Sequence, residues 1–161
     1  MKRNTIRFTA MLLVMVMMLC ACGSKDQSFS NNGLYMELPG SYRALSENEM
    51  VGFTFGMGDK KSVVLGLKEE KSMFESYGLN LTLDEYTDLV IEANGLNTTV
   101  KYEGGIPTFT FTNYVDGTYF KYLAATFEGK DAFWLIQFAC EEGKFDDMYS
   151  SFIKYLSTVR A

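Results

Sequence analysis

The sequence predicts a single α+β domain, with one antiparallel β-sheet of about six to seven strands and two main helices packed on it. Short alternating segments are separated by turns rich in glycine and aspartate, which indicates strands joined as hairpins. Two segments of helical periodicity stand apart from the strands, as in α+β proteins. With 161 residues, the chain has room for one such domain and a short appendage.

In the first half of the domain we expect three strands. The first covers residues 34–38 (LYMEL) and ends at Pro39-Gly40. A β-hairpin is expected over residues 50–69, because apolar residues alternate on both sides of a turn at Gly58-Asp59-Lys60. The alternating apolar residues are Val51, Phe53, Phe55 and Met57 before the turn, and Val63, Leu65 and Leu67 after it.

Two helices carry apolar stripes. The first is predicted over residues 82–93, where Thr82 and Glu85 form a capping box and Asn94-Gly95 ends the helix. Its stripe consists of Leu83, Tyr86, Leu89, Val90 and Ala93. The second helix is predicted over residues 145–157, with the stripe Phe145, Met148, Tyr149, Phe152, Ile153 and Leu156.

The second half between these helices is rich in strands. A short strand is expected at 98–102, followed by strands at 108–114 and 119–127 that are joined by a turn at Asp116-Gly117. Residues 132–140 (AFWLIQFAC) are apolar on both faces apart from Gln137, so this strand should lie centrally in the sheet.

Two side chains of this central strand carry specific expectations. Trp134 and Cys140 share one face of the strand, together with Ile136 and Phe138. We therefore expect Trp134 to be mostly buried and Cys140 to be a buried, slowly reacting thiol.

The N-terminus predicts export. Lys2, Arg3 and Arg7 precede an uncharged run of about a dozen residues, 8–19, which is shorter than the roughly 20 residues needed to span a bilayer. A basic start, a short apolar core and small residues near its end are typical of a secretory signal peptide.

The end of this segment, Leu19-Cys20-Ala21-Cys22, resembles the lipobox of bacterial lipoproteins. The resemblance implies cleavage before Cys22, whose thiol would carry a diacylglyceryl group. Cys20 fits less well, and an ordinary signal peptide with chance cysteines is the alternative. We expect a signal peptide at 1–21, the lipidated cysteine and a flexible tether at 22–33, and a folded domain at 34–161.

Cleavage changes the composition of the chain. Removal of residues 1–21 removes three basic residues and no acidic one, which leaves 12 Lys and Arg against 20 Asp and Glu, a net charge of −8. Anionic lipid headgroups and nucleic acids repel such a charge, so we expect membrane attachment through the lipid alone and no nucleic-acid partner. Cys140 is left without a second thiol for an intramolecular disulfide.

The mature sequence also resembles the PsbP-like domains, which include bacterial DcrB-type lipoproteins. The resemblance rests on the opening segment 33–42 (GLYMELPGSY, with Tyr42 where Trp is usual), the hairpin at 50–69, the segment 82–86 and the closing helix at 145–157. It covers nearly all of residues 33–161. It implies an α+β fold and a mostly non-enzymatic role through protein contacts or ligands, and it assigns no functional residue.

The sequence lacks the motifs of several common catalytic and binding sites. The chain has no histidine, which removes Ser-His-Asp and Cys-His catalysis and histidine metal sites. The acidic pairs at 69–70, 141–142 and 146–147 are adjacent in sequence and do not converge on one point, so we expect solvated surface. No phosphate-binding loop, dinucleotide fingerprint or nucleophile elbow occurs, so no cofactor, metal or catalytic residue is expected.

The remaining candidates are aromatic. Five tyrosines in predicted strands could form a ligand or partner surface, although packing within the sheet is the explanation that we favour. They are Tyr35, Tyr102, Tyr114, Tyr119 and Tyr122.

Together these features predict an extracytoplasmic lipoprotein of the bacterial envelope, anchored to the cell membrane. We expect it to act as a non-catalytic binding or accessory module, with an envelope protein or a small ligand as partner. The alternatives are a small carboxylate-dependent hydrolase and a small ligand-binding component of a transport system.

Overall fold

The computed structural model describes residues 25–161. The expected signal peptide and Cys22 therefore lie outside the described residues. The strands are β1 (Gln27–Asn31), β2 (Leu34–Leu38), β3 (Arg43–Ala44), β4 (Phe55–Gly58), β5 (Ser62–Glu70), β6 (Lys101–Glu103), β7 (Ile106–Val115), β8 (Thr118–Glu128) and β9 (Ala132–Glu141). The helices are α2 (Lys71–Ser76), α3 (Leu83–Ala93) and α4 (Phe145–Leu156), with short 3-10 turns η1 (Glu47–Glu49) and η2 (Glu142–Lys144).

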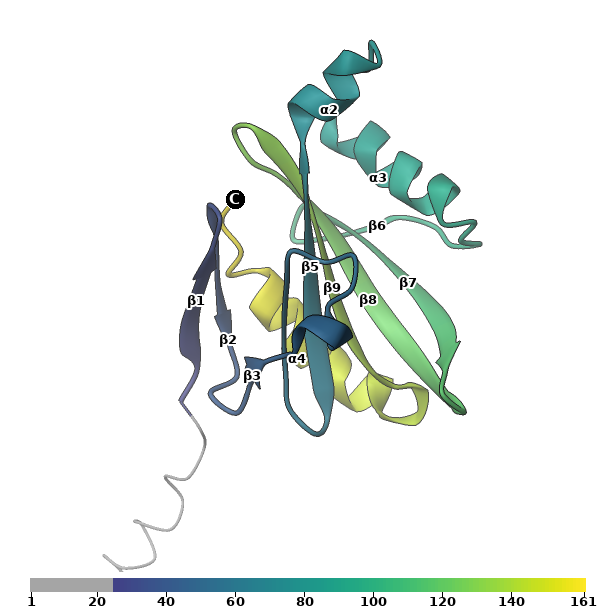
Figure 1. The fold of residues 1–161 in the computed structure, drawn as a ribbon. Helices are drawn as coiled ribbons and strands as arrows, with labels where there is room; N and C mark the ends of the chain where they lie inside the picture. Colours follow the sequence, from purple (N-terminus) through teal and green to yellow (C-terminus); the bar gives the residue numbers. More distant parts are fainter. Residues whose placement is uncertain (1–24) are drawn as a thin grey trace, which may run out of the picture.

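Seven strands form one antiparallel sheet in the order β3-β4-β5-β9-β8-β7-β6 (Figure 1). The remaining two, β1 and β2, pair with each other beside it. The predicted α+β domain with six to seven antiparallel strands is thus confirmed. The strand that is apolar on both faces, β9, is the fourth of seven, as its sequence predicted.

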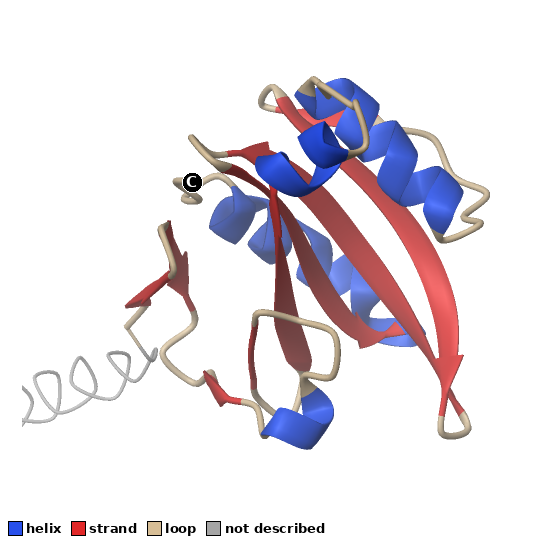
Figure 2. Ribbon diagram, turned by 45° about the horizontal axis from the view of Figure 1, so that its top comes forward, coloured by secondary structure: helices blue, strands red, loops and turns tan. Residues whose placement is uncertain are grey.

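Alternate residues of β9 point into two separate cores on opposite faces of the sheet. One face packs Trp134, Ile136 and Phe138 against α4 and the β1–β2 hairpin. The other packs Phe133 and Leu135 against α2 and α3. Figure 2 shows α4 behind the sheet and α2 and α3 in front of its upper part. Both main helices pack on the sheet, one on each face.

Local chemistry accounts for the bounds of α3 and of the β7–β8 hairpin. The Thr82 hydroxyl accepts a hydrogen bond from the Glu85 backbone N–H, and the Glu85 carboxylate accepts one from the Thr82 backbone N–H. Beyond the helix, Gly95 has a φ of +61°, the left-handed conformation that ends many helices. Asp116 and Gly117 both have positive φ, at +47° and +87°, as a tight hairpin turn requires.

The segment expected as a flexible tether differs from that expectation. Residues 27–31 form β1, although their side chains are mostly polar. The Gln27 side-chain amide donates to the backbone carbonyls of Pro39 (3.0 Å) and Tyr42 (2.9 Å), and the Phe29 ring packs on Phe55 with centroids 4.7 Å apart. The folded region therefore begins before residue 34.

The expected hairpin at 50–69 is shorter than its sequence pattern suggested. Residues 50–54 form turns, with Gly52 at a φ of +84° and Val51 79% exposed, so β4 begins only at Phe55. The strand expected at 98–102 is likewise found at 101–103.

Among the described residues, no helix is both long enough and apolar enough to cross a membrane.

Candidate functional site

An open hollow of about 400 Å³ lies on the face of the sheet that carries α3. In Figure 2, α2 and α3 cover the upper part of this face, and the lower parts of β7 and β8 extend beyond them. The hollow is bounded on one side by the turn before β4 and on the other by the C-terminal end of α3. We call it the sheet groove, and its lining residues are Phe53, Leu65, Val90, Asn94, Leu96, Phe109, Phe111, Thr112, Asn113, Tyr122, Leu135 and Gln137.

Aromatic rings from β7 and β8 build much of the floor of the sheet groove. Phe111 and Tyr122 are cross-strand partners, and their rings stack with centroids 4.6 Å apart and planes 5° from parallel. The Phe109 ring follows along the strand, 6.3 Å from that of Phe111. Such mutual packing fixes the orientation of the rings before any ligand arrives.

Polar but uncharged side chains complete the lining. Gln137 is half-buried on β9, opposite Leu65 of β5 and Ala124 of β8. The Asn94 amide donates to the Val90 carbonyl (2.8 Å), which orients the side chain at the end of α3. Burial raises the pKa of the Tyr122 hydroxyl, so this group remains neutral at physiological pH and can donate or accept a hydrogen bond.

The sheet groove contains no Asp, Glu, Lys or Arg among its lining residues. The arrangement can hold a neutral molecule through ring contacts and hydrogen bonds, but its lining offers no carboxylate for acid–base chemistry. None of the acidic pairs singled out from the sequence lines the groove, but the Glu142 carboxylate lies at its edge, where it accepts a hydrogen bond from the Thr112 hydroxyl (3.3 Å). Glu69 accepts a hydrogen bond from the Tyr86 hydroxyl (2.7 Å), and Glu70 forms an ion pair with Lys68 (2.8 Å).

The five candidate tyrosines do not come together in one surface. Tyr122 lines the sheet groove. Tyr114 and Tyr119 lie near the tip of the β7–β8 hairpin, more than half exposed, with ring centroids 4.7 Å apart. Tyr102 on β6 donates a hydrogen bond to Asp84 (2.8 Å), and Tyr35 lies in the separate β1–β2 sheet.

The central strand places its two distinctive side chains as expected. Trp134 is 2% exposed and Cys140 is 1% exposed, both in the core beneath α4. Burial raises the pKa of the Cys140 thiol, which lowers the fraction of reactive thiolate. Within residues 25–161, no three His, Cys, Asp or Glu side chains form a group that could hold a metal ion.

Most residues that line the sheet groove could not be identified from the sequence. Phe53 lies in a segment that the sequence predicts to be a strand, and the sequence marks Asn94 only as the end of a helix. Gln137 carried the one available signal, because it is the single polar residue in an otherwise apolar strand. Such a residue on a central strand indicates a part of the sheet that is not covered by apolar side chains.

Comparison with known proteins agrees with the fold. No family model matches the sequence, and no curated protein matches it. The chain is similar in structure to cyanobacterial PsbP (CyanoP) from Synechocystis sp. PCC 6803, with a TM-score of 0.56 and 15% identity over 86% of this chain and 93% of that one. A crystal structure from Bacteroides thetaiotaomicron VPI-5482 gives a TM-score of 0.56 at 12% identity and covers 86% of this chain.

The fold is therefore PsbP-like, as the sequence resemblance implied. This chain spans about half of the Bacteroides protein, covering 48% of it, but nearly all of CyanoP. The structural similarity establishes the fold, but at identities of 12–15% it carries no function from one protein to the other.

Proposed function

We propose that this protein is a non-catalytic binding module of the bacterial envelope, held on the outer face of the cell membrane by a diacylglyceryl group on Cys22. The lipobox-like segment at 19–22 supports the anchor, since two acyl chains give stable attachment. The PsbP-like fold and its resemblance to a mostly non-enzymatic family support an accessory role.

The uncharged sheet groove is the observation that carries the binding proposal. Its volume of about 400 Å³ falls in the range of small-molecule sites, and charged residues make up 22% of the chain but none of its lining. Aromatic rings pack against the C–H faces of a sugar, while the amides of Asn94 and Gln137 can exchange hydrogen bonds with its hydroxyls. The chemistry fits a small neutral saccharide.

Binding can be tested by calorimetry with neutral hexose and N-acetylhexosamine oligomers, using uronic-acid oligomers as the charged comparison. We expect a heat of binding only with one of the neutral series, and we expect Tyr122→Ala to abolish this heat of binding. Tyr119→Ala is the matched control, because Tyr119 lies on the same strand but outside the groove lining. Equal loss in both variants would contradict the assignment of the site.

Capture in living cells provides a second readout. A photo-crosslinking amino acid in place of Phe53 should capture the ligand of the groove. The same amino acid in place of Tyr77 should not capture it, since Tyr77 is 80% exposed and lies outside the groove. Capture of an envelope protein at position 53 would favour a protein partner over a sugar. Turnover of an envelope substrate that one Asp or Glu substitution abolished would favour the hydrolase alternative.

The anchor has its own test. Mass spectrometry of the mature N-terminus should find Cys22 as the first residue, carrying acyl mass. Cys22→Ala should release the protein from membranes, whereas Cys20→Ala, two residues away, should leave it attached. A mature chain that begins elsewhere without lipid would contradict the lipobox assignment.

A further inference from the structure

Strand β7 is paired on both sides over only part of its length. Its inner side pairs with β8 as far as Val115, whereas its outer side pairs with β6 only at residues 106–108. One side-chain contact, from the Thr98 hydroxyl to the Thr110 carbonyl (2.8 Å), continues the outer side to residue 110. In Figure 1, and again in Figure 2, the lower half of β7 forms the margin of the sheet, with no strand beyond it. We call residues 111–115 the open edge.

The backbone groups of two residues point out of the open edge. In an antiparallel sheet, the N–H and C=O of successive residues point to opposite neighbouring strands. The hairpin closes at Val115, so the backbone groups of residues 111, 113 and 115 point to β8, and those of Thr112 and Tyr114 point outward. Within residues 25–161, the Tyr114 N–H donates to the Asn113 side chain (2.9 Å), and no hydrogen bond reaches the N–H and C=O of Thr112 or the C=O of Tyr114.

The open edge lacks the features that keep exposed strands from pairing. Natural sheet edges are commonly short, charged, or interrupted by proline or a bulge. The two terminal strands of this sheet have such features, because β3 consists of Arg43–Ala44 alone and the three residues of β6 begin with Lys101 and end with Glu103. The open edge, FTNYV, has five residues with no charge, no proline and a regular register against β8. It therefore presents an unprotected template for another strand.

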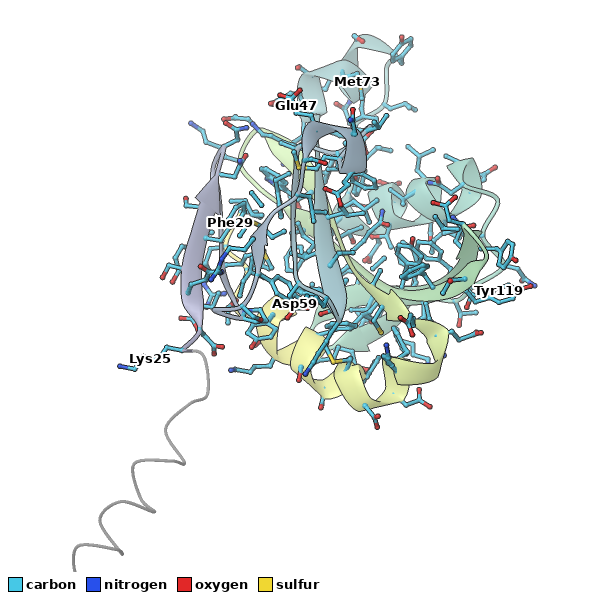
Figure 3. All side chains as sticks on the ribbon, turned by 60° about the horizontal axis from the view of Figure 1, so that its bottom comes forward. Lys25, Phe29, Glu47, Asp59, Met73 and Tyr119 are labelled. Carbon is cyan, nitrogen blue, oxygen red and sulfur yellow. The ribbon has the colours of Figure 1, made fainter. Side chains whose placement is uncertain are left out.

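Exposed aromatic side chains flank these backbone groups. Tyr114 on the open edge and its cross-strand partner Tyr119 are both exposed, with ring centroids 4.7 Å apart. Figure 3 shows Tyr119 at the outer margin of the molecule, far from Lys25. A side chain placed opposite Tyr114 by an added strand would pack on its ring, which is the contact that stabilises neighbouring strands.

Charges of both signs lie next to the open edge, on the face that carries α4. The Thr112 hydroxyl donates to the Glu142 carboxylate (3.3 Å), and the cross-strand neighbour of Thr112, Lys121, has its ammonium group 4.7 Å from the centroid of the Phe145 ring. Asp146 lies on the same face, in a hollow that Lys121 also lines. The other face carries the uncharged sheet groove. Recognition along the open edge is therefore expected to depend on the backbone and not on charge.

We infer that the open edge of β7 binds an extended segment of a partner protein, which adds to the sheet as a further strand. The partner segment would bond to the N–H and C=O of Thr112 and to the C=O of Tyr114, and its alternate side chains would lie on the two faces of the sheet. Since the edge is uncharged, the matching segment is an uncharged one rich in β-branched and aromatic residues.

The length of the open edge favours a peptide segment over a second copy of this chain. Five residues of strand span roughly 16 Å. Two rigid domains meeting along such a strip would bury far less than the roughly 800 Å² per partner of a stable interface, whereas a flexible segment can also follow the sheet onto its faces.

Backbone pairing can be tested with peptides of about twelve residues, selected from a random library displayed on phage against the purified full-length protein. A selected peptide is then synthesised in two forms, N-methylated on one or the other set of alternate residues. One form should bind like the parent peptide, and the other at least about 10-fold more weakly, because only one set of N–H groups points to β7. Enrichment of no peptide, or equal binding of the two forms, would overturn the inference.

Hydrogen exchange, followed by NMR, locates the added strand. The Thr112 N–H should exchange quickly in the free protein and at least about 10-fold more slowly with peptide bound, whereas the Asn113 N–H, which points to β8, should be protected in both states. A peptide that binds without slowing exchange at Thr112 lies elsewhere and would contradict the assignment of the edge.

A substitution in the strand tests the same group from the side of the protein. Thr112→Pro removes the outward N–H, which the sheet does not use, and should abolish peptide binding. Thr112→Val keeps this N–H and a β-branched shape, and should bind the peptide like the wild type. Circular dichroism checks that both variants fold, and the comparison of N-methylated peptides needs no variant. A dimer in solution that Thr112→Pro dissociates would assign the open edge to a second copy and overturn the peptide segment. None of these results depends on saccharide binding or on the lipid at Cys22.

Discussion

The ring of Tyr86 on α3 lies flat against the ring of Phe133 on β9, with centroids 4.5 Å apart and planes 10° from parallel. The Tyr86 hydroxyl also donates a hydrogen bond of 2.7 Å to Glu69 on β5. Phe74 of α2 meets both rings edge-on, at 5.9 and 6.1 Å. One side chain thus joins two helices to two strands and holds the α3 wall of the sheet groove in place.

The hydrogen bond of Tyr86 can be removed without removing its ring. Tyr86→Phe should lower the free energy of unfolding by about 1 kcal/mol, because the half-buried Glu69 loses a donor but regains water. Tyr86→Leu should cost more, since the stack on Phe133 is lost as well. Urea denaturation measures both, with Tyr77→Phe, at an 80% exposed site, as the control. A Tyr86→Phe loss no larger than that control would show that this bond does not stabilise the fold.

Tyr42 predicts a stability change at high pH. Burial raises the pKa of its hydroxyl, which is hydrogen-bonded to Ser62, from near 10 to about 12. A raised pKa in the folded state favours the protonated form, so the contribution is complete below pH 10 and is lost as the pH rises through 12.

The comparison with Tyr42→Phe isolates this effect from other titrating groups. The difference in unfolding free energy between the two proteins should shift against the wild type by at most roughly 3 kcal/mol between pH 10 and 12. Urea denaturation at intervals of pH measures it. A difference that stays constant over this range would mean that Tyr42 ionises as readily in the folded as in the unfolded chain.

Gly66 makes room for an aromatic ring. It pairs across the strands with Phe55, and a Cβ at this position would stand only 2.0 Å from the Phe55 Cε1 atom. Gly66→Ala should therefore destabilise the protein by about 1–3 kcal/mol. Gly143→Ala is the control, because no atom lies within 4 Å of the place that its Cβ would occupy. Adding Phe55→Leu should recover part of the loss; strict additivity would exclude the clash as its cause.

Cys140 should react slowly with thiol reagents in native buffer, because it is 1% exposed and its raised pKa keeps it protonated. With Cys20 and Cys22 replaced by serine, Cys140 is the one cysteine in the chain. Absorbance of released thionitrobenzoate should show fast labelling only after denaturant is added, whereas Ser150→Cys, at an exposed site on α4, should label at once. Rapid native labelling of Cys140 would conflict with the register of β9, since a slip of one residue exchanges its faces.

Elements encoded by neighbouring residues could be predicted from the sequence. The strand at 34–38, the helix at 83–93 and the central strand at 132–141 lie where turn residues, a capping box and apolar patterning placed them. The strand at 27–31 could not be found in this way. Its polar residues are held by Gln27 reaching Pro39 and Tyr42, a contact between distant parts of the chain that no local pattern reveals.

The sheet groove was predictable only in part, for a physical reason. The strand patterns identify Tyr122 as a candidate surface residue and Gln137 as the single polar residue of an apolar strand. The hollow itself depends on which strand ends α3 leaves uncovered and on where the turn before β4 places Phe53. Those relationships arise from tertiary packing, which overrides the alternation that made residues 50–54 resemble a strand.

The central place of β9 has a consequence for the order in which the protein can fold. In the sheet, β9 lies between β5 and β8 and pairs with both. Its pairing with β5 sets Ser62 opposite Cys140, two residues that are far apart in the sequence. During synthesis the hairpins β4–β5 and β7–β8 can form separately, but the sheet cannot close until β9 has emerged. Late closure of this kind would keep the chain unfolded until it is nearly complete, which is the state that export through the proposed signal peptide requires.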